Sequence, residues 1–140
     1  MLSRPHLAAL PAAVVFWILG AIWYTVFSAP WLAGIGKTAD VLMAETRGGP
    51  LPYVIGFGAI LVMCLMLSWL VARLNARTLA GGARLGAVCA IGFCASLLAL
   101  NYGFEKRTVT LWAINAGYAL LGLSISGAII GAWPWPRRKI

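Results

Sequence analysis

Four long apolar stretches, separated by short polar segments, dominate the pattern along the chain. Each is close to the roughly 20 residues that a helix needs to cross a lipid bilayer, and charged residues are confined to the edges of the stretches. The sequence therefore predicts an all-α membrane protein, a four-transmembrane-helix bundle that forms a single domain over residues 1–140. The predicted transmembrane helices cover about residues 7–28, 52–72, 84–102 and 109–133.

The polar connection between the first two stretches is longer than the other two. Thr38 is placed to cap a short helix over residues 39–45, because a threonine hydroxyl can accept a hydrogen bond from the first helical turn. Ala39, Leu42 and Met43 would share one face of that helix. We expect it to rest on the outer membrane surface as an interfacial helix.

Composition strengthens the membrane interpretation. Hydrophobic residues make up 62% of the 140 residues and charged residues only 10%, whereas soluble domains typically carry about 25% charge. The net charge of +8 does not indicate a nucleic-acid partner, because the basic residues form short clusters and no nucleic-acid-binding motif accompanies them. The expected partner is the lipid bilayer.

The distribution of basic residues predicts an orientation, since Lys and Arg favour the cytoplasmic side of short loops. Seven of the eleven lie on the side shared by both termini and the second connection, and four lie on the opposite side with all three acidic residues. We therefore expect both termini to be cytoplasmic. The seven are Arg4, Arg73, Arg77, Arg84, Arg137, Arg138 and Lys139, and the four are Lys37, Arg47, Lys106 and Arg107.

Small residues recur every four positions in the third apolar stretch: Gly82, Gly86, Ala90 and Cys94. Lipid tails are as apolar as leucine, so membrane helices associate where small residues let their backbones approach. This stripe predicts close helix packing. The pattern leaves open whether the packing occurs within one chain or between copies.

Residues with catalytic or metal-binding chemistry are scarce. His6 is the single histidine, the three cysteines form no C-x-x-C motif, and no acidic residue lies inside an apolar stretch. A zinc or bis-histidine haem site needs more ligands than this chain offers, and proton relays usually place ionisable groups within the membrane. We therefore expect no catalytic residue, no cofactor and no metal, and we do not expect an enzyme.

One polar cluster stands out at the connection between the third and fourth stretches: Asn101, Glu105, Asn115 and Tyr118. Asn101 and Glu105 are four residues apart and would share a helix face, and a tight turn would bring Asn101 and Asn115 to similar depth. Two interpretations of this cluster remain open. The cluster forms either a small polar pocket open to the outer side or a set of inter-helix hydrogen bonds that fixes the hairpin. We favour the hydrogen bonds.

Several short motifs resemble one known family. They are Leu19-Gly20-Ala21-Ile22-Trp23-Tyr24, Gly36-Lys37-Thr38, the segment from Asn101 to Arg107, and Gly117-Tyr118. Together they resemble the DUF1761 family of small bacterial integral membrane proteins of unknown function. The resemblance implies a four-helix fold in the bacterial cytoplasmic (inner) membrane, and it implies no activity.

These observations lead to two functional hypotheses. The first is a protein that acts by association, as a homo-oligomer or as an accessory subunit of a larger membrane complex. The alternative is an oligomeric permease or channel for a small neutral solute, whose path the cluster of Asn101, Asn115 and Tyr118 would line.

Overall fold

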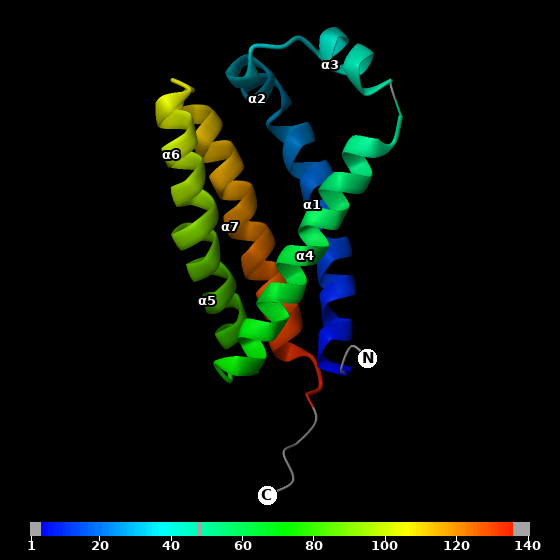
Figure 1. The fold of residues 1–140 in the computed structure, drawn as a ribbon, viewed down its shortest axis with the longest axis vertical. Helices are drawn as coiled ribbons and strands as arrows, with labels where there is room; N and C mark the ends of the chain where they lie inside the picture. Colours follow the sequence, from blue (N-terminus) through cyan, green and yellow to red (C-terminus); the bar gives the residue numbers. More distant parts are fainter. Residues whose placement is uncertain (1–3, 48, 136–140) are drawn as a thin grey trace, which may run out of the picture.

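Four long helices lie side by side in the computed structural model, which describes residues 4–47 and 49–135 (Figure 1). All four are long and apolar enough to cross a membrane, which confirms the predicted all-α membrane fold. The first long helix is α1 (Ala9–Val26), which is preceded by a short 3-10 turn, η1 (Arg4–Ala8). The second is α4 (Leu51–Arg73). The third runs through α5 (Leu79–Cys89), the π-helical η2 (Ala90–Ala95) and α6 (Ser96–Phe104), and the fourth is α7 (Val109–Ala132).

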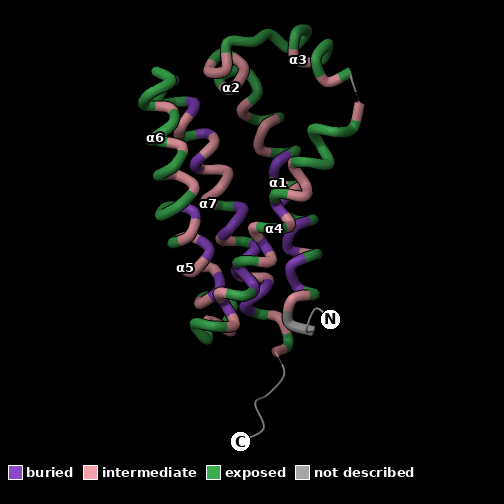
Figure 2. Tube along the Cα trace, in the orientation of Figure 1, coloured by how far each residue is buried: buried purple, intermediate pink, exposed green. Residues whose placement is uncertain are grey.

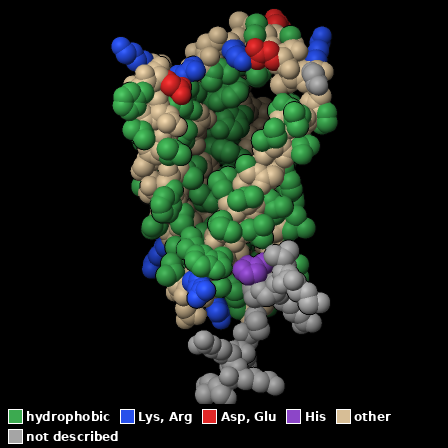
Figure 3. Space-filling model, in the orientation of Figure 1, with side chains coloured by type: hydrophobic (Ala, Val, Ile, Leu, Met, Phe, Trp, Pro, Cys, Tyr) green, Lys and Arg blue, Asp and Glu red, His purple; other side chains and the backbone are tan. Residues whose placement is uncertain are grey.

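The two ends of the molecule differ in what connects the helices. The end at Val26, Leu51, Phe104 and Val109 is called the upper end, and the opposite end is called the lower end (Figure 1). Two short helices, α2 (Ser28–Ile35) and α3 (Ala39–Thr46), lie at the upper end. Charged side chains gather at both ends, while hydrophobic side chains cover the flank between them (Figure 3).

The third long helix begins at Leu79, about five residues before the predicted start at residue 84. Thr78 explains the difference, because its hydroxyl caps the helix by accepting a hydrogen bond from the Gly81 N–H at 2.9 Å. The helix widens into π geometry at η2, where the Ser96 hydroxyl donates to the Ile91 carbonyl at 2.9 Å. Single π-helical turns of this kind occur mostly as insertions in α-helices.

The upper connection contains one helix that the sequence predicts and one that it does not. Thr38 caps α3 through a 3.4 Å hydrogen bond from the Val41 N–H, so the short helix forms where we expected it. Its position on a membrane surface stays a prediction. The unpredicted helix, α2, ends at Ile35 and is capped by Gly36, whose φ of +71° is the left-handed conformation that glycine adopts most readily.

The lower half is held together by direct backbone contact between α5 and α7. A Cβ atom on Gly82 would lie 1.9 Å from the Gly127 carbonyl oxygen, and one on Gly86 would lie 2.0 Å from the Leu123 carbonyl oxygen. No larger residue fits at these distances without moving a helix, so the glycines set how closely the two helices approach. A Cβ atom on Gly131 would likewise lie 2.2 Å from the Thr78 carbonyl oxygen.

The predicted small-residue stripe therefore faces the interior of this chain. Ala90 is 1% exposed and belongs to the core, and Cys94 is half-buried. Most core residues lie in the lower half and along α7 (Figure 2). Phe16 fills the space over Gly122, where a Cβ would lie 1.8 Å from its ring. The core thus combines close backbone contacts between α5 and α7 with a large side chain, Phe16, that packs between α1 and α7.

Candidate functional site: an aromatic cleft in the upper half

The α6–α7 pair and α4 diverge toward the upper end (Figure 1), and the space-filling view shows a hollow between them (Figure 3). Two adjoining spaces occupy this region. One, called the α1–α4 groove, has a volume of about 580 Å³, and the other, called the tyrosine cavity, has a volume of about 440 Å³. Both are lined in part by Tyr24, Met63 and Tyr118.

A chain of hydrogen bonds links three helices at the tyrosine cavity. The Tyr24 hydroxyl on α1 donates to Asn115 Oδ1 on α7 at 2.9 Å. Asn115 Nδ2 donates in turn to the Tyr102 hydroxyl on α6 at 2.8 Å. An asparagine inside an apolar helix needs such partners, because unsatisfied polar groups are costly in lipid.

Tyr118 forms the wall between the two spaces. Its hydroxyl donates to the Phe16 carbonyl at 3.3 Å, and its ring packs against the rings of Phe16 and Tyr24 with centroids 5.0 and 5.1 Å away. Gly20 makes this position possible, because a Cβ there would lie 2.7 Å from the Tyr118 hydroxyl oxygen. The ring is therefore held between α1 and α7.

The short helix α2 borders the tyrosine cavity near its upper end. Trp31 packs edge-on against Tyr24, with centroids 5.3 Å apart, and lines the cavity together with Ile35. α2 is fixed to α7 by Gly34, where a Cβ would lie 2.9 Å from the Cβ of the buried Leu111. A loop segment thus contributes part of the site.

The structure brings together only part of the predicted polar cluster. Asn115 and Tyr118 both line the tyrosine cavity. Asn101 is exposed on α6 and, among the described residues, has no side-chain hydrogen-bond partner. Glu105 is exposed at the turn, where it accepts a 3.1 Å hydrogen bond from Arg107 Nε.

The physical reason is the helix rotation of about 100° between neighbouring residues. That rotation turns Tyr102, rather than Asn101, toward Asn115. The cluster predicted from the sequence does not include Tyr24 and Tyr102, the two hydrogen-bond partners of Asn115. A tyrosine hydroxyl near a helix end, at the depth of an asparagine within an apolar helix, is the signal that could have found them.

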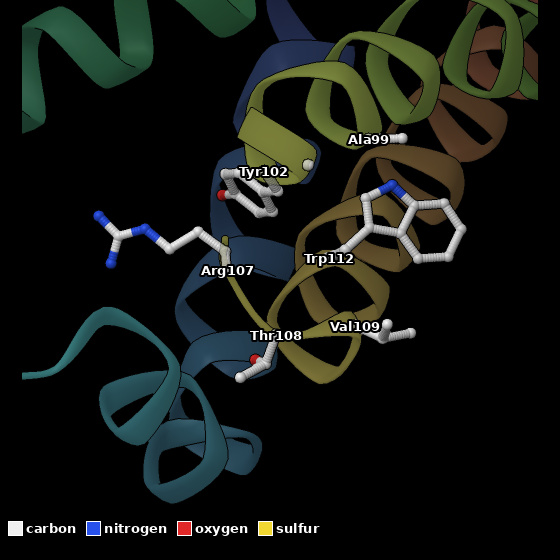
Figure 4. A pocket seen from close by; sticks show the side chains of 7 residues that line it. Ala99, Tyr102, Arg107, Thr108, Val109 and Trp112 are labelled. Carbon is white, nitrogen blue, oxygen red and sulfur yellow. The ribbon is translucent and has the colours of Figure 1, made fainter. Parts of the chain in front are cut away.

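A third hollow, of about 330 Å³, lies at the turn between α6 and α7 (Figure 4). Tyr102 and Trp112 border it, while the Arg107 guanidinium points away from Trp112. The Trp112 indole N–H donates to the Ala95 carbonyl at 2.9 Å, which ties α7 to the π-helical segment. This contact holds the hairpin between the third and fourth long helices together.

Groups that could hold a metal do not gather in the part of the chain that the structure describes. No three of its His, Cys, Asp and Glu residues lie close enough to share an ion. His6 lies near the lower end, where its Nδ1 is 3.2 Å from the Ser68 hydroxyl oxygen. The chemistry of the cleft is therefore that of tyrosine hydroxyls, one amide and aromatic rings.

The fold and the cleft define a class, that of a multi-pass membrane protein with four long apolar helices. The chain belongs to the DUF1761 family, whose description is "Protein of unknown function (DUF1761)" and whose model matches residues 7–131. No curated protein and no solved structure matches the chain significantly.

Proposed function

We propose that this protein is a non-catalytic component of the bacterial cytoplasmic membrane that acts by association, as a homo-oligomer or as an accessory subunit of a larger complex. The α1–α4 groove carries this proposal. Its lining includes the small, exposed residues Ala21 and Ala59, which would let a helix backbone approach closely.

The contrast between buried and exposed small residues supports the same proposal. The stripe at Gly82 and Gly86 is used inside the chain, against α7. In the α1–α4 groove, Gly20 and Gly56 likewise contact Tyr118 and Trp17 of the same chain, whereas Ala21 and Ala59 are exposed. We propose that a second copy of the chain packs into the α1–α4 groove, because this requires no other protein.

Extraction in mild detergent, followed by light scattering on the eluted particle, tests association. We expect a mass above that of one chain, and we expect Ala59→Trp to reduce it by filling the groove. Leu97→Trp is the matched control, because Leu97 is exposed on α6 and lines neither the groove nor the cavity. A wild-type particle that contains one chain and no other protein would exclude the proposal.

The proposed orientation places both termini in the cytoplasm, with the lower end facing inward. Its support is the excess of Lys and Arg on that side. In a background without Cys64, Cys89 and Cys94, a cysteine at Lys37 should react with an impermeant thiol reagent added outside the cell. A cysteine at Arg77 should not, and the reverse pattern would overturn the orientation.

A permease or channel is the second candidate, and the upper cavities favour it. The backbone contacts of Gly82 and Gly86 with α7 argue against a path through one chain, because they close the α5–α7 interface in the lower half. A path would therefore need an oligomer. Solute flux in proteoliposomes should then fall in Asn115→Leu and persist in Asn101→Leu, while flux equal to that of empty liposomes would end this candidate.

A further inference from the structure

The tyrosine cavity combines apolar walls with a small set of hydrogen-bonding groups. Its polar side chains are Tyr24, Tyr102, Tyr118 and Asn115, and no Asp, Glu, Lys, Arg or His is among the described residues that line it. Ligand sites typically have volumes of about 300–1,000 Å³ and place a few polar groups in a mainly apolar lining. A charged ligand would lose its hydration here without gaining an ion pair. The lining therefore favours a neutral molecule.

The hydrogen-bond chain leaves one tyrosine donor unused. The Tyr24 hydroxyl donates to Asn115, and Asn115 donates to Tyr102. The Tyr102 O–H then has no acceptor among the described residues, since a hydroxyl has a single hydrogen to donate. The second N–H of the Asn115 amide is likewise without a described acceptor.

One tyrosine O–H and one amide N–H stay unused whichever way the Asn115 amide is oriented. Exchanging the oxygen and nitrogen of Asn115 would let Tyr102 donate and Tyr24 accept. The unused hydroxyl hydrogen would then belong to Tyr24 instead, and both tyrosines line the cavity. In either arrangement one tyrosine O–H and one amide N–H remain for a ligand that carries an acceptor.

The depth of the lining residues gives the ligand a direction. Tyr24 and Tyr102 lie near the upper ends of α1 and α6. Phe16, Met63 and Ala119 line the cavity nearer to mid-membrane, given a rise of about 1.5 Å per residue. A polar head would face the upper end and an apolar body would extend downward between aromatic rings.

We propose that the tyrosine cavity binds a neutral amphipathic molecule whose head is a planar ring bearing carbonyl groups, such as an alkylated quinone. A carbonyl oxygen has two lone pairs and can accept from the tyrosine O–H and the amide N–H together. The planar ring packs against Trp31, Tyr24 and Tyr118, and the alkyl tail lies against the deeper apolar lining. This proposal is independent of whether the protein also associates with other chains.

Binding of two probes to the full-length protein in nanodiscs tests the proposal. The probes are decylbenzoquinone, which has two carbonyl groups, and decylbenzene, which has none. We expect the quinone to bind at least about 3- to 10-fold more tightly, after subtraction of partition into empty nanodiscs, as one or two net hydrogen bonds predict. This comparison uses the wild-type chain and so does not depend on the folding of a variant.

Tyrosine-to-phenylalanine variants locate the site. The double variant Tyr24→Phe with Tyr102→Phe should lose about 3- to 10-fold in quinone affinity and little in decylbenzene affinity. Tyr53→Phe is the matched control and should keep both affinities, because Tyr53 lines the α1–α4 groove and not the tyrosine cavity.

Two outcomes would overturn the proposal. Equal affinities for the two probes would mean that the cavity takes any lipid chain without reading a carbonyl. Quinone retention no greater than in empty nanodiscs would mean that no such site exists. Neither outcome changes the particle mass measured for association, so the two proposals fail separately.

Discussion

The lower and upper halves of α7 meet their neighbours in opposite ways. In the lower half Gly127 lies against the α5 backbone, with a Cβ position 2.1 Å from the Gly82 carbonyl oxygen. In the upper half the same helix presents Asn115 and Tyr118, and it reaches α1 and α6 through side-chain hydrogen bonds. One helix therefore produces a closed contact at one end and a cleft at the other.

The size of the side chains explains the difference. Membrane helices without a large hydrophobic driving force between them approach as closely as their contact residues allow. Glycines remove the side-chain layer in the lower half, whereas Tyr24, Tyr102 and Tyr118 hold the upper helices apart. The stability of the lower half should therefore depend mainly on close packing, and that of the upper half on hydrogen bonding.

The largest effect is expected from Gly82→Ala. The added methyl group would meet the Gly127 carbonyl, a backbone atom that cannot rotate away, so α5 and α7 would have to separate. Overpacking of this kind costs about 1–3 kcal/mol, and occasionally more. The free energy of unfolding in mixed detergent micelles measures the loss.

Gly58→Ala is the control for that measurement, because a Cβ on Gly58 meets no heavy atom of the described residues within 4 Å. It should leave the protein as stable or more stable by up to about 1 kcal/mol, since alanine favours helix over glycine. Similar losses in both variants would show that the α5–α7 contact is not closed as described.

A smaller effect is expected from Asn115→Ala in the upper half. The change removes the two hydrogen bonds to Tyr24 and Tyr102, and hydrogen bonds between membrane helices average about 0.6 kcal/mol each. We expect a loss of about 1 kcal/mol in the same unfolding assay. Asn101→Ala should have almost no effect, because Asn101 is exposed, and an equal loss in both would contradict the hydrogen-bond chain.

The smallest effect is expected from Ser126→Ala, which removes the bond from the buried Ser126 hydroxyl to the Ala12 carbonyl. At 3.4 Å this bond is long, so we expect a loss of about 0.5 kcal/mol or less. Ser124→Ala on the same helix is the control. A loss larger than that of Asn115→Ala would show that hydrogen bonding matters as much in the lower half as in the upper half.

Sequence patterns predict the local features of this fold well. The four apolar helices and the Thr38 cap of α3 depend on residues that are close in the chain, and the glycine stripe depends on spacing within one helix. Such patterns follow directly from helix geometry. They predict which residues share a face, but not which helix that face will meet.

The contacts that build the cleft depend on partners far apart in the chain. Tyr24 and Asn115 are 91 positions apart, and so are Trp23 and Ile114, where the Trp23 indole donates to the Ile114 carbonyl at 3.0 Å. The break at Phe27 and the packing of α2 against α7 add to the cleft, and no periodic pattern indicates either of them. Asn101 and Tyr102 are neighbours, and only the rotation of the packed helix decides which one faces Asn115.

The distances between spin labels on α4 and the third long helix test the difference between the halves most directly. In a background without the native cysteines, Val54→Cys with Leu100→Cys labels exposed upper positions, and Met66→Cys with Val88→Cys labels exposed lower positions. We expect a clearly longer distance for the upper pair than for the lower pair, because α4 diverges from α6 toward the upper end (Figure 1). Equal distances, or a shorter upper distance, would contradict a closed lower half below an open cleft.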